Sequence, residues 1–356
     1  MLNVCLTFDY ELFLGKNYAS PEEILFKRSQ NIADAISSYG GRGTFFVDVC
    51  SVRAHRKHGA YDYANAFEQQ IKAFVREGHD VQLHIHPNWI FSRVEDNQII
   101  PGEKGYRLHD FGFSQQPMNA NTIIRDEIEY LQGVCSLADE NYKCIAYRAG
   151  GFALQPEKEV FKALIDNGIL IDSSIVPGMK SDTINAYDYT KTPNKLNWWI
   201  DPSLGLDIAV EEEKNRIFEV PVATARPRLW ELIGKKKAEL SLPPSKKLGE
   251  YVALPSAITK HQGSISKIVH RFFDYRYVSL DTRYYKRVLD DLAYLYKKYK
   301  LDRKDGYVCL IGHPKLADNY RVDNIGLLVK AIQNDSRYSI VTMRNIYNNI
   351  HKGEQK

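Results

Sequence analysis

Residues 78–89 read GHDVQLHIHPNW and carry the clearest fold signal in the chain. The apolar run 81–83 predicts a buried strand, and this strand ends in His84-Ile85-His86. Side chains two residues apart on an extended backbone point to the same side, so the two imidazoles could bind one metal ion together. Taken alone, such a histidine pair is more often an ordinary surface feature. Its meaning therefore depends on the residues that end the other strands.

Strands and helices alternate along the rest of the chain, without a sequence repeat and without a glycine-rich phosphate loop. The predicted strands are residues 2–8, 44–49, 81–86, 144–147, 169–171, 217–222, 307–312 and 338–341, and the predicted helices are residues 20–40, 65–77, 122–138, 156–167, 281–299 and 324–333. This alternation indicates a mainly parallel sheet. Because polar residues collect where the strands end, as in barrel enzymes, we expect an α/β fold, a distorted (β/α) barrel of about seven strands. An open sheet is the alternative.

The length of 356 residues would permit two or three domains, but α/β barrels often occupy this length as one. We expect residues 1–356 to form a single barrel domain with loop insertions around 90–119 and 175–280. Long loops after strands are more often functional than incidental. Residues 227–267 are rich in lysine, proline and leucine, and we assign no element there.

The composition is that of an ordinary globular protein, with 44% hydrophobic residues, 26% charged residues and a formal charge of +4. The runs Lys235-Lys236-Lys237 and Lys246-Lys247 have no interleaved aromatic residues, so we interpret them as a solvated face and expect no nucleic-acid partner. No stretch has the length and apolarity of a membrane span, so we expect no stable membrane insertion. The five cysteines form no C-x-x-C pair and no leader-peptide pattern opens the chain, which predicts a reducing, cytoplasmic location.

Acidic, basic and imidazole side chains follow several of the predicted strands. They are Asp9, Glu11, His84, His86, Arg148, Asp172 and His313. Each of these residues alone is more often structural than catalytic. Together they contain what metal-assisted hydrolysis requires, namely carboxylate and imidazole ligands, a base, a positive group that orients the base, and a separate histidine acid.

In order and context these motifs resemble those of the polysaccharide deacetylases of carbohydrate esterase family 4, the NodB-homology group. The similar segments are TFDYE at 7–11, GHD through His84 at 78–84, RAGG at 148–151, IDSS at 171–174 and LIGH at 310–313. The resemblance spans residues 2 to about 315. Each motif is short, and their shared order makes the resemblance specific. It implies a deacetylase-like barrel.

Two positions depart from the family pattern. Tyr10 stands where the family has a second, metal-binding aspartate, and the next acid is Glu11, which an extended strand would place on the same side as Asp9. Asn88 stands where the family has its second metal-binding histidine, four residues after His84. We therefore expect Glu11 and His84 as ligands, with either His86 or the amide oxygen of Asn88 completing the site.

The resemblance implies a divalent metal, which we expect to be zinc, with cobalt or nickel as alternatives. By motif position Asp9 is the base, although it could instead bind the metal with Glu11 as helper. Arg148 would orient Asp9, and His313 would protonate the departing amine. We count Asp172 among the catalytic residues. We also expect Tyr10 and Gly150, which belong to the same motifs, to contact the substrate.

Tryptophans in predicted loops near the strand ends are candidates for sugar binding. Flat apolar rings with polar edges suit sugar rings, so we expect Trp89 and Trp198 to serve as platforms. The alternative is that these tryptophans pin long loops to the barrel.

These observations predict a cytoplasmic, metal-dependent hydrolase that removes N-acetyl groups from a sugar, a precursor of a surface polysaccharide or lipopolysaccharide. One alternative is a non-hydrolytic glycan-binding relative that has lost the metal, which Tyr10 and Asn88 would suit. Another is a hydrolase of a different C–N amide bond. The oligomeric state stays open, because the chain shows no coiled-coil heptads.

Overall fold

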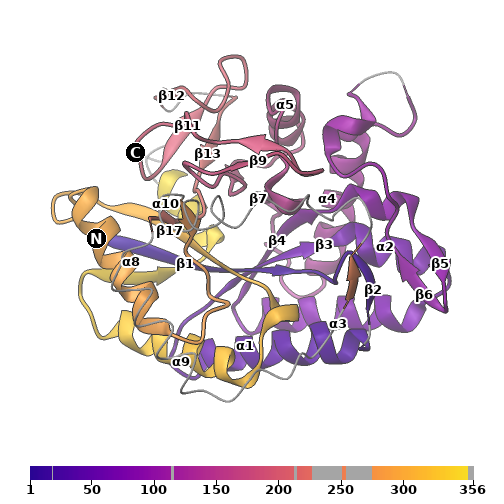
Figure 1. The fold of residues 1–356 in the computed structure, drawn as a ribbon, viewed down its shortest axis with the longest axis horizontal. Helices are drawn as coiled ribbons and strands as arrows, with labels where there is room; N and C mark the ends of the chain where they lie inside the picture. Colours follow the sequence, from indigo (N-terminus) through magenta and orange to yellow (C-terminus); the bar gives the residue numbers. More distant parts are fainter. Residues whose placement is uncertain (18, 114–115, 212–214, 227–250, 254–274, 352–356) are drawn as a thin grey trace, which may run out of the picture.

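A computed structural model describes residues 1–17, 19–113, 116–211, 215–226, 251–253 and 275–351 (Figure 1). The lysine runs at 235–237 and 246–247, and most of residues 227–267, lie outside this part of the chain. The interpretation of the two lysine runs as a solvated face therefore stays a prediction.

A curled, mainly parallel sheet forms the centre of the molecule. Its parallel strands follow one another in space in the order β17 (Gly306–Gly312), β1 (Leu2–Tyr10), β3 (Thr44–Asp48), β4 (Asp80–Ile85), β7 (Ala146–Ala149), β8 (Ile171–Asp172) and β13 (Ile217–Glu219). Beyond β13 the chain continues to Val222, which forms a parallel bridge with Cys309 of β17. The sheet thus curls until its two ends meet, which confirms the predicted distorted barrel over an open sheet.

Three more strands extend this sheet. β18 (Tyr338–Val341) pairs with the first half of β1, on the edge whose second half pairs with β3. β11 (Trp198–Ile200) and β12 (Ala209–Val210) add antiparallel strands beyond β13. β1 is buried along nearly its whole length, as expected for a parallel strand that is covered on both faces.

Helices cover the outside of the barrel (Figure 1). They are α1 (Lys27–Ser37), α2 (Val49–Lys57), α3 (Tyr61–Arg76), α4 (Ala120–Cys135), α5 (Lys158–Asp166), α8 (Tyr285–Lys298), α9 (Asn319–Gln333) and α10 (Met343–His351). In α3 the buried residues Tyr63, Phe67, Ile71 and Phe74 recur at the helical period, so one stripe of the helix faces the sheet.

The starts of two helices, and the number of helices, differ from the sequence prediction. Ser20 and Glu23 form a capping box at the start of the predicted helix 20–40, with the Glu23 amide donating to Ser20 Oγ at 3.3 Å, and a π-helical turn (η1, Glu22–Phe26) then leads into α1. α8 begins at Tyr285 rather than at Asp281, whose carboxylate binds His313. α2 and α10 were not predicted.

The loop insertions contain short elements of their own. Residues 90–119 hold the hairpin of β5 (Arg93–Glu95) and β6 (Gln98–Ile100) and the 3-10 turn η3 (Leu108–Phe111). Residues 175–211 hold the pair β9 (Lys180–Ser181) and β10 (Tyr187–Asp188), followed by β11 and β12. Two further antiparallel pairs join β2 (Gly15–Asn17) to β15 (Tyr251–Ala253) and β14 (Thr224–Ala225) to β16 (Arg276–Tyr277).

The single-domain organisation stays a prediction. All five cysteines are free and buried. No helix in the described part of the chain is long and apolar enough to cross a membrane.

Candidate metal centre

The strand-end residues meet at the carboxyl ends of the parallel strands. Register across the sheet brings them together, because Asp48 of β3 lies opposite His84 of β4, and His84 lies opposite Arg148 of β7. The next pairing places Tyr147 opposite Asp172 of β8. The predicted grouping of these residues at one end of the barrel is therefore observed.

Glu11, His84 and His86 form a buried cluster whose ligand atoms all lie within 4.8 Å of one another. Glu11 Oε2 is 3.5 Å from His84 Nε2 and in contact with His86 Nε2. All three atoms are buried, and none has a hydrogen-bond partner outside this cluster. Together they converge on one point and provide the nitrogen and oxygen donors that zinc takes. The residues present therefore fit a divalent metal.

The orientation of the histidine rings is set by their neighbours. His84 Nδ1 is 2.8 Å from the carbonyl oxygen of Arg148, and since a carbonyl only accepts, Nδ1 carries a hydrogen. In the neutral imidazole, Nε2 is then the nitrogen whose lone pair could bind a metal. Gly150 packs against the other ring, where an added Cβ would lie 2.6 Å from His86 Nδ1. The absence of a side chain at Gly150 thus leaves room for the His86 ring, and the expected contact of Gly150 with the substrate stays a prediction.

His86 joins the cluster, whereas the position of Asn88 is set by Gly102. The side-chain amide Nδ2 of Asn88 donates to the Gly102 carbonyl at 3.4 Å, and the Gly102 backbone amide donates to the backbone carbonyl of Asn88 at 3.0 Å. Asn88 Oδ1 is nonetheless buried without a hydrogen-bond partner. His86 is therefore the third ligand that the geometry supports, and a fourth contact from Asn88 stays a prediction.

Arg148 holds Asp9 in one orientation beside the cluster. The guanidinium is fully buried; Nη1 donates to Asp9 Oδ1 at 2.7 Å, and Nε and Nη2 donate to the carbonyl and hydroxyl of Ser173, both at 2.9 Å. Burial by itself would raise the pKa of Asp9, but the charges of Arg148, His84 and His313 outweigh it and lower this pKa below the ordinary value. Asp9 is therefore an ionised carboxylate with one oxygen fixed.

His313 lies on the other side of Asp9 and has a partner that the sequence analysis missed. His313 Nδ1 is 2.9 Å from Asp281 Oδ2, and its backbone amide donates to Asp281 Oδ1 at 2.7 Å. Its Nε2 faces Asp9 Oδ2 at 3.8 Å. Burial tends to lower the pKa of His313, but the charges of Asp281 and Asp9 raise it above the ordinary value. A strand-end pattern could have identified Asp281, since it directly follows the extended segment 278–280, whose Ser279 forms a parallel bridge with Ile311 of β17.

Lys315 and Asp48 are two further charged residues that were not predicted. Lys315 Nζ donates to Glu11 Oε1 at 2.7 Å and to the Leu12 carbonyl at 3.2 Å. Burial would raise the pKa of Glu11, but Lys315 and His86 hold it well below the ordinary value. Asp48 Oδ1 accepts from the His86 amide at 3.3 Å. Asp48 ends the strand TFFVD, so the strand-end pattern could have identified it, whereas nothing local marked Lys315.

Asp172 is bound by Ser174, two residues further along the chain. The residue is fully buried, and both its oxygens are bound by Ser174, which donates from its hydroxyl at 2.7 Å and from its amide at 3.1 Å. Glu219 of β13 lies opposite Asp172 in the sheet, and burial together with the charge of Asp172 raises the pKa of Glu219 well above the ordinary value. Asp172 therefore orders the segment that carries Ser173, the partner of Arg148, and its catalytic role stays a prediction.

The three aromatic residues expected at the substrate are buried elsewhere. Tyr10 is fully buried and donates its hydroxyl to Gln70 at 2.8 Å, because it lies between Asp9 and Glu11 on the strand and so points to the opposite face. Trp89 is 1% exposed and packs near the ring of His55. Trp198 is 3% exposed and donates its indole hydrogen to the Leu206 carbonyl. None offers a ring face to a sugar in this structure, and the alternative that the tryptophans pin loops to the barrel fits their burial.

Comparison with known proteins returns similarity of structure only. No family model and no curated protein matches the chain. Similar solved structures include one named as a polysaccharide deacetylase from Mycobacterium smegmatis, with 13% identity, a TM-score of 0.49, and coverage of 99% of this chain and 91% of that chain. PuuE allantoinase has 11% identity, a TM-score of 0.48 and coverage of 98% and 90%. A structure named as a polysaccharide deacetylase from Pseudomonas aeruginosa PAO1 has 12% identity, a TM-score of 0.45 and coverage of 98% and 91%.

Proposed function

We propose that this chain is a metal-dependent hydrolase that removes N-acetyl groups from a sugar. The observation that carries this proposal is the convergence of three buried ligand atoms with no hydrogen-bond partner outside their cluster, from Glu11, His84 and His86, beside the Arg148-bound carboxylate of Asp9. The donor set suits zinc, with cobalt or nickel as alternatives. The motif resemblance supports the acetylated sugar as substrate, and the free, buried cysteines are consistent with a cytoplasmic reaction on a precursor of a surface glycan.

A bound divalent metal would polarise the acetyl carbonyl and lower the pKa of water from 15.7 toward ~7. Asp9 is ionised and fixed at Oδ1 by Arg148, so Oδ2 is the atom that would accept the proton of the attacking water. His313 is oriented by Asp281 at Nδ1, which leaves Nε2 to donate a proton to the departing amine. The C–N bond breaks, and the products are acetate and the free amino sugar.

The close approach of Asp9 and His313 suits this division of roles. Asp9 Oδ2 and His313 Nε2 are 3.8 Å apart, so a base and an acid face one another beside the metal ligands. The depressed pKa of Asp9 and the raised pKa of His313 favour an ionised base and a protonated acid at the same neutral pH.

Lys315 favours one competing function. Its ammonium already binds Glu11 Oε1, so a cation is present at the centre without any metal. A glycan-binding relative that has lost the metal would keep Glu11 ionised in this way. The two functions differ in whether Glu11, His84 and His86 bind a metal.

Metal analysis of protein purified without chelator separates these functions. We expect about one zinc per chain in the wild type, lost in Glu11→Gln and His84→Ala and retained in the control His109→Ala, whose histidine is exposed on the 90–119 insertion. Release of acetate from N-acetylglucosamine oligomers should follow the metal content. The hydrolase would be ruled out, and the binding protein favoured, if the wild type contains no metal, binds none after addition of zinc, cobalt or nickel, and releases no acetate.

A further inference from the structure

A second cavity lies outside the barrel, away from the metal centre. It has a volume of about 430 Å³, within the range of small-ligand sites, and shares no lining residue with the cluster of Glu11, His84 and His86. Its walls come from three places, namely the end of α8, the loop 190–196 and the segment 221–226 after β13. Its floor includes Val222 and Val308, beside the bridge that closes the barrel.

The charged residues of this cavity all have one sign. Among the described residues that line it, the charged ones are Lys195, Arg226 and Lys298, and none is acidic. Three tyrosines, Tyr275, Tyr294 and Tyr299, share the lining. Cations at a partly enclosed surface attract anions, and tyrosine rings with their hydroxyls suit the faces and edges of a sugar ring.

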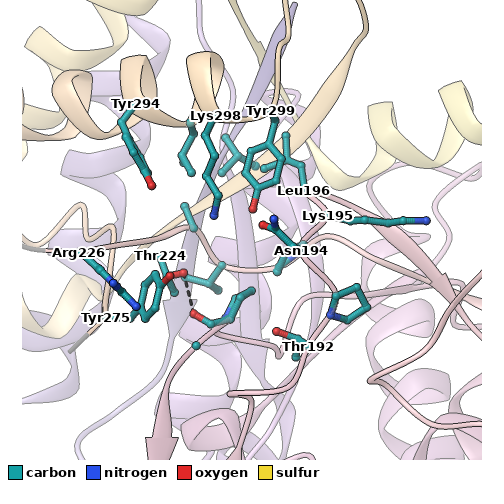
Figure 2. Close-up of a pocket in the computed structure, with 18 of the residues that line it drawn as sticks. Thr192, Asn194, Lys195, Leu196, Thr224, Arg226, Tyr275, Tyr294, Lys298 and Tyr299 are labelled. Atoms are coloured by element: carbon teal, nitrogen blue, oxygen red, sulfur yellow. Dashed lines mark hydrogen bonds between the residues drawn. The ribbon is translucent and has the colours of Figure 1, made fainter. Parts of the chain in front are cut away.

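Figure 2 shows which of these groups face the interior. The ammonium of Lys298 and the hydroxyl of Tyr294 point from α8 into the cavity, as does the hydroxyl of Tyr299, the residue that follows α8. Arg226 lies beside Tyr275. Lys195 contributes its stem to the rim, and its ammonium points away. Lys298 therefore points into the cavity and Arg226 lies against Tyr275 on another wall, whereas Lys195, which is also exposed, points away and provides a natural control.

The wall that carries Arg226 is held in place by packing. The guanidinium lies 4.7 Å from the centre of the Tyr275 ring. Beneath that ring is Gly178, at φ +79°, where an added Cβ would come within 2.6 Å of Tyr275 Cδ2, so the ring rests directly on the glycine backbone. Thr224 further ties this wall to the loop by donating to the Pro177 carbonyl at 2.8 Å. The arginine is thus positioned by a ring, and within the described part of the chain no carboxylate neutralises it.

We propose that this cavity binds an anionic sugar, a single sugar ring that carries a phosphate or a carboxylate. Arg226 and Lys298 bind the anionic group from different walls, and the tyrosines contact the ring. The proposal does not depend on the hydrolase activity, because none of these residues belongs to the metal centre.

Calorimetric titration of the full chain tests this site. The probes are glucose 1-phosphate and glucuronate, compared with glucose and inorganic phosphate. We expect one of the two anionic sugars to bind, which identifies phosphate or carboxylate as the group recognised, and glucose to bind at least about ten-fold more weakly, because it lacks the charge-assisted contacts.

Matched variants locate the binding. Arg226→Gln and Lys298→Met should each lower the affinity for the anionic sugar by about five-fold or more, while the affinity of Lys195→Met should stay within about two-fold of that of the wild type. All three lysine and arginine side chains are exposed, so these variants should fold. The His84→Ala variant, which removes a metal ligand, should bind the sugar unchanged.

Four results would overturn the proposal. They are no binding of either anionic sugar at about 10 mM, equal affinity for inorganic phosphate and glucose 1-phosphate, affinity unchanged in Arg226→Gln and Lys298→Met, and binding that disappears in His84→Ala. The last result would place the anion at the metal centre. Loss of acetate release in the same variants would bear on the hydrolase alone, so the two proposals fail separately.

Discussion

Replacing Arg148 by methionine tests the pairing on which the proposed base depends. Arg148 is fully buried, donates one hydrogen bond to Asp9 and two to Ser173, and lies with its guanidinium 4.3 Å from the centre of the Phe46 ring. Methionine has a long, flexible apolar side chain, so the substitution removes the charge and the donors and leaves little empty space.

The expected loss of stability follows from the groups left behind. Breaking a buried ion pair by removing one partner costs about 3–5 kcal/mol, because Asp9 would keep an uncompensated charge. The Ser173 carbonyl loses its donor, which adds about 1 kcal/mol, whereas the Ser173 hydroxyl still donates to the Val220 carbonyl. We therefore expect Arg148→Met to lower the free energy of unfolding by roughly 4–6 kcal/mol at pH 7, a large part of the roughly 5–15 kcal/mol typical of a protein.

The pH dependence of this loss has a definite sign. In the wild type the pKa of Asp9 lies below its ordinary value, so this carboxylate contributes stability above pH ~4 and loses it as pH falls through the lowered pKa. In Arg148→Met the pKa of Asp9 should rise, because burial no longer has an opposing guanidinium. The difference in stability between the two proteins should therefore shrink as the pH is lowered.

Urea unfolding followed by circular dichroism measures the effect in a double-mutant cycle. The four proteins are the wild type, Arg148→Met, Asp9→Asn and the double variant. We expect the double variant to be about 2–3 kcal/mol more stable than the sum of the single losses predicts, since neither charge is then left unpaired. Additive losses within about 0.5 kcal/mol would show that Arg148 and Asp9 do not act as a pair.

Three further predictions concern the ligands, the acid and a buried glutamate. His86→Ala should abolish zinc retention during gel filtration, whereas Asn88→Ala should retain it; the reverse order of losses would make Asn88 the third ligand. Asp281→Asn should lower kcat/KM for acetate release at least about ten-fold and move the alkaline limb of the pH profile to lower pH, because Asp281 helps raise the pKa of His313; an unmoved limb would contradict this role. Burial raises the pKa of Glu127 to about 7 against the opposing charge of Arg53, so the folded state binds the carboxyl proton of Glu127 more tightly than the unfolded state does. The stability that this proton contributes is lost as the pH rises from about 4.5 to 7. Between pH 5 and pH 8 the free energy of unfolding of Glu127→Gln should accordingly rise by up to about 3 kcal/mol relative to that of the wild type, measured by urea unfolding. A difference that does not change with pH would argue against a protonated glutamate.

The carboxylates and histidines of the candidate metal centre were predictable because their arrangement is largely local. Asp9 and Glu11 lie two residues apart at the end of one strand, as do His84 and His86, and alternation of side chains across a strand requires no knowledge of the partner strands. The same rule also places Tyr10 on the opposite face, so its assignment to the substrate conflicted with the pattern that identified its neighbours. Strand-end position likewise led to Arg148 and His313, since parallel strands bring their carboxyl ends to one edge.

The residues that sequence reasoning missed or misplaced depend on long-range packing. Asp281 and Lys315 reach the centre because the segment before α8 and the turn after β17 meet there, and no local pattern specifies that meeting. Trp89 looked available in a loop, but α2, which was not predicted, brings His55 against it and covers its ring. Burial of a side chain is decided by what packs over it.

Backbone geometry over a few residues was enough to predict the alternation of strands and helices and the side of each strand on which its polar residues lie. The two histidines and two carboxylates of the centre follow from that pattern. Folding of the whole barrel was needed to pair Arg148 with Asp9 across 139 positions of the chain, to join His86 to Glu11, and to bring Lys315 to Glu11. Those contacts depend on strand register and on the helices that cover the sheet, and both are set by packing between segments that lie far apart in the chain.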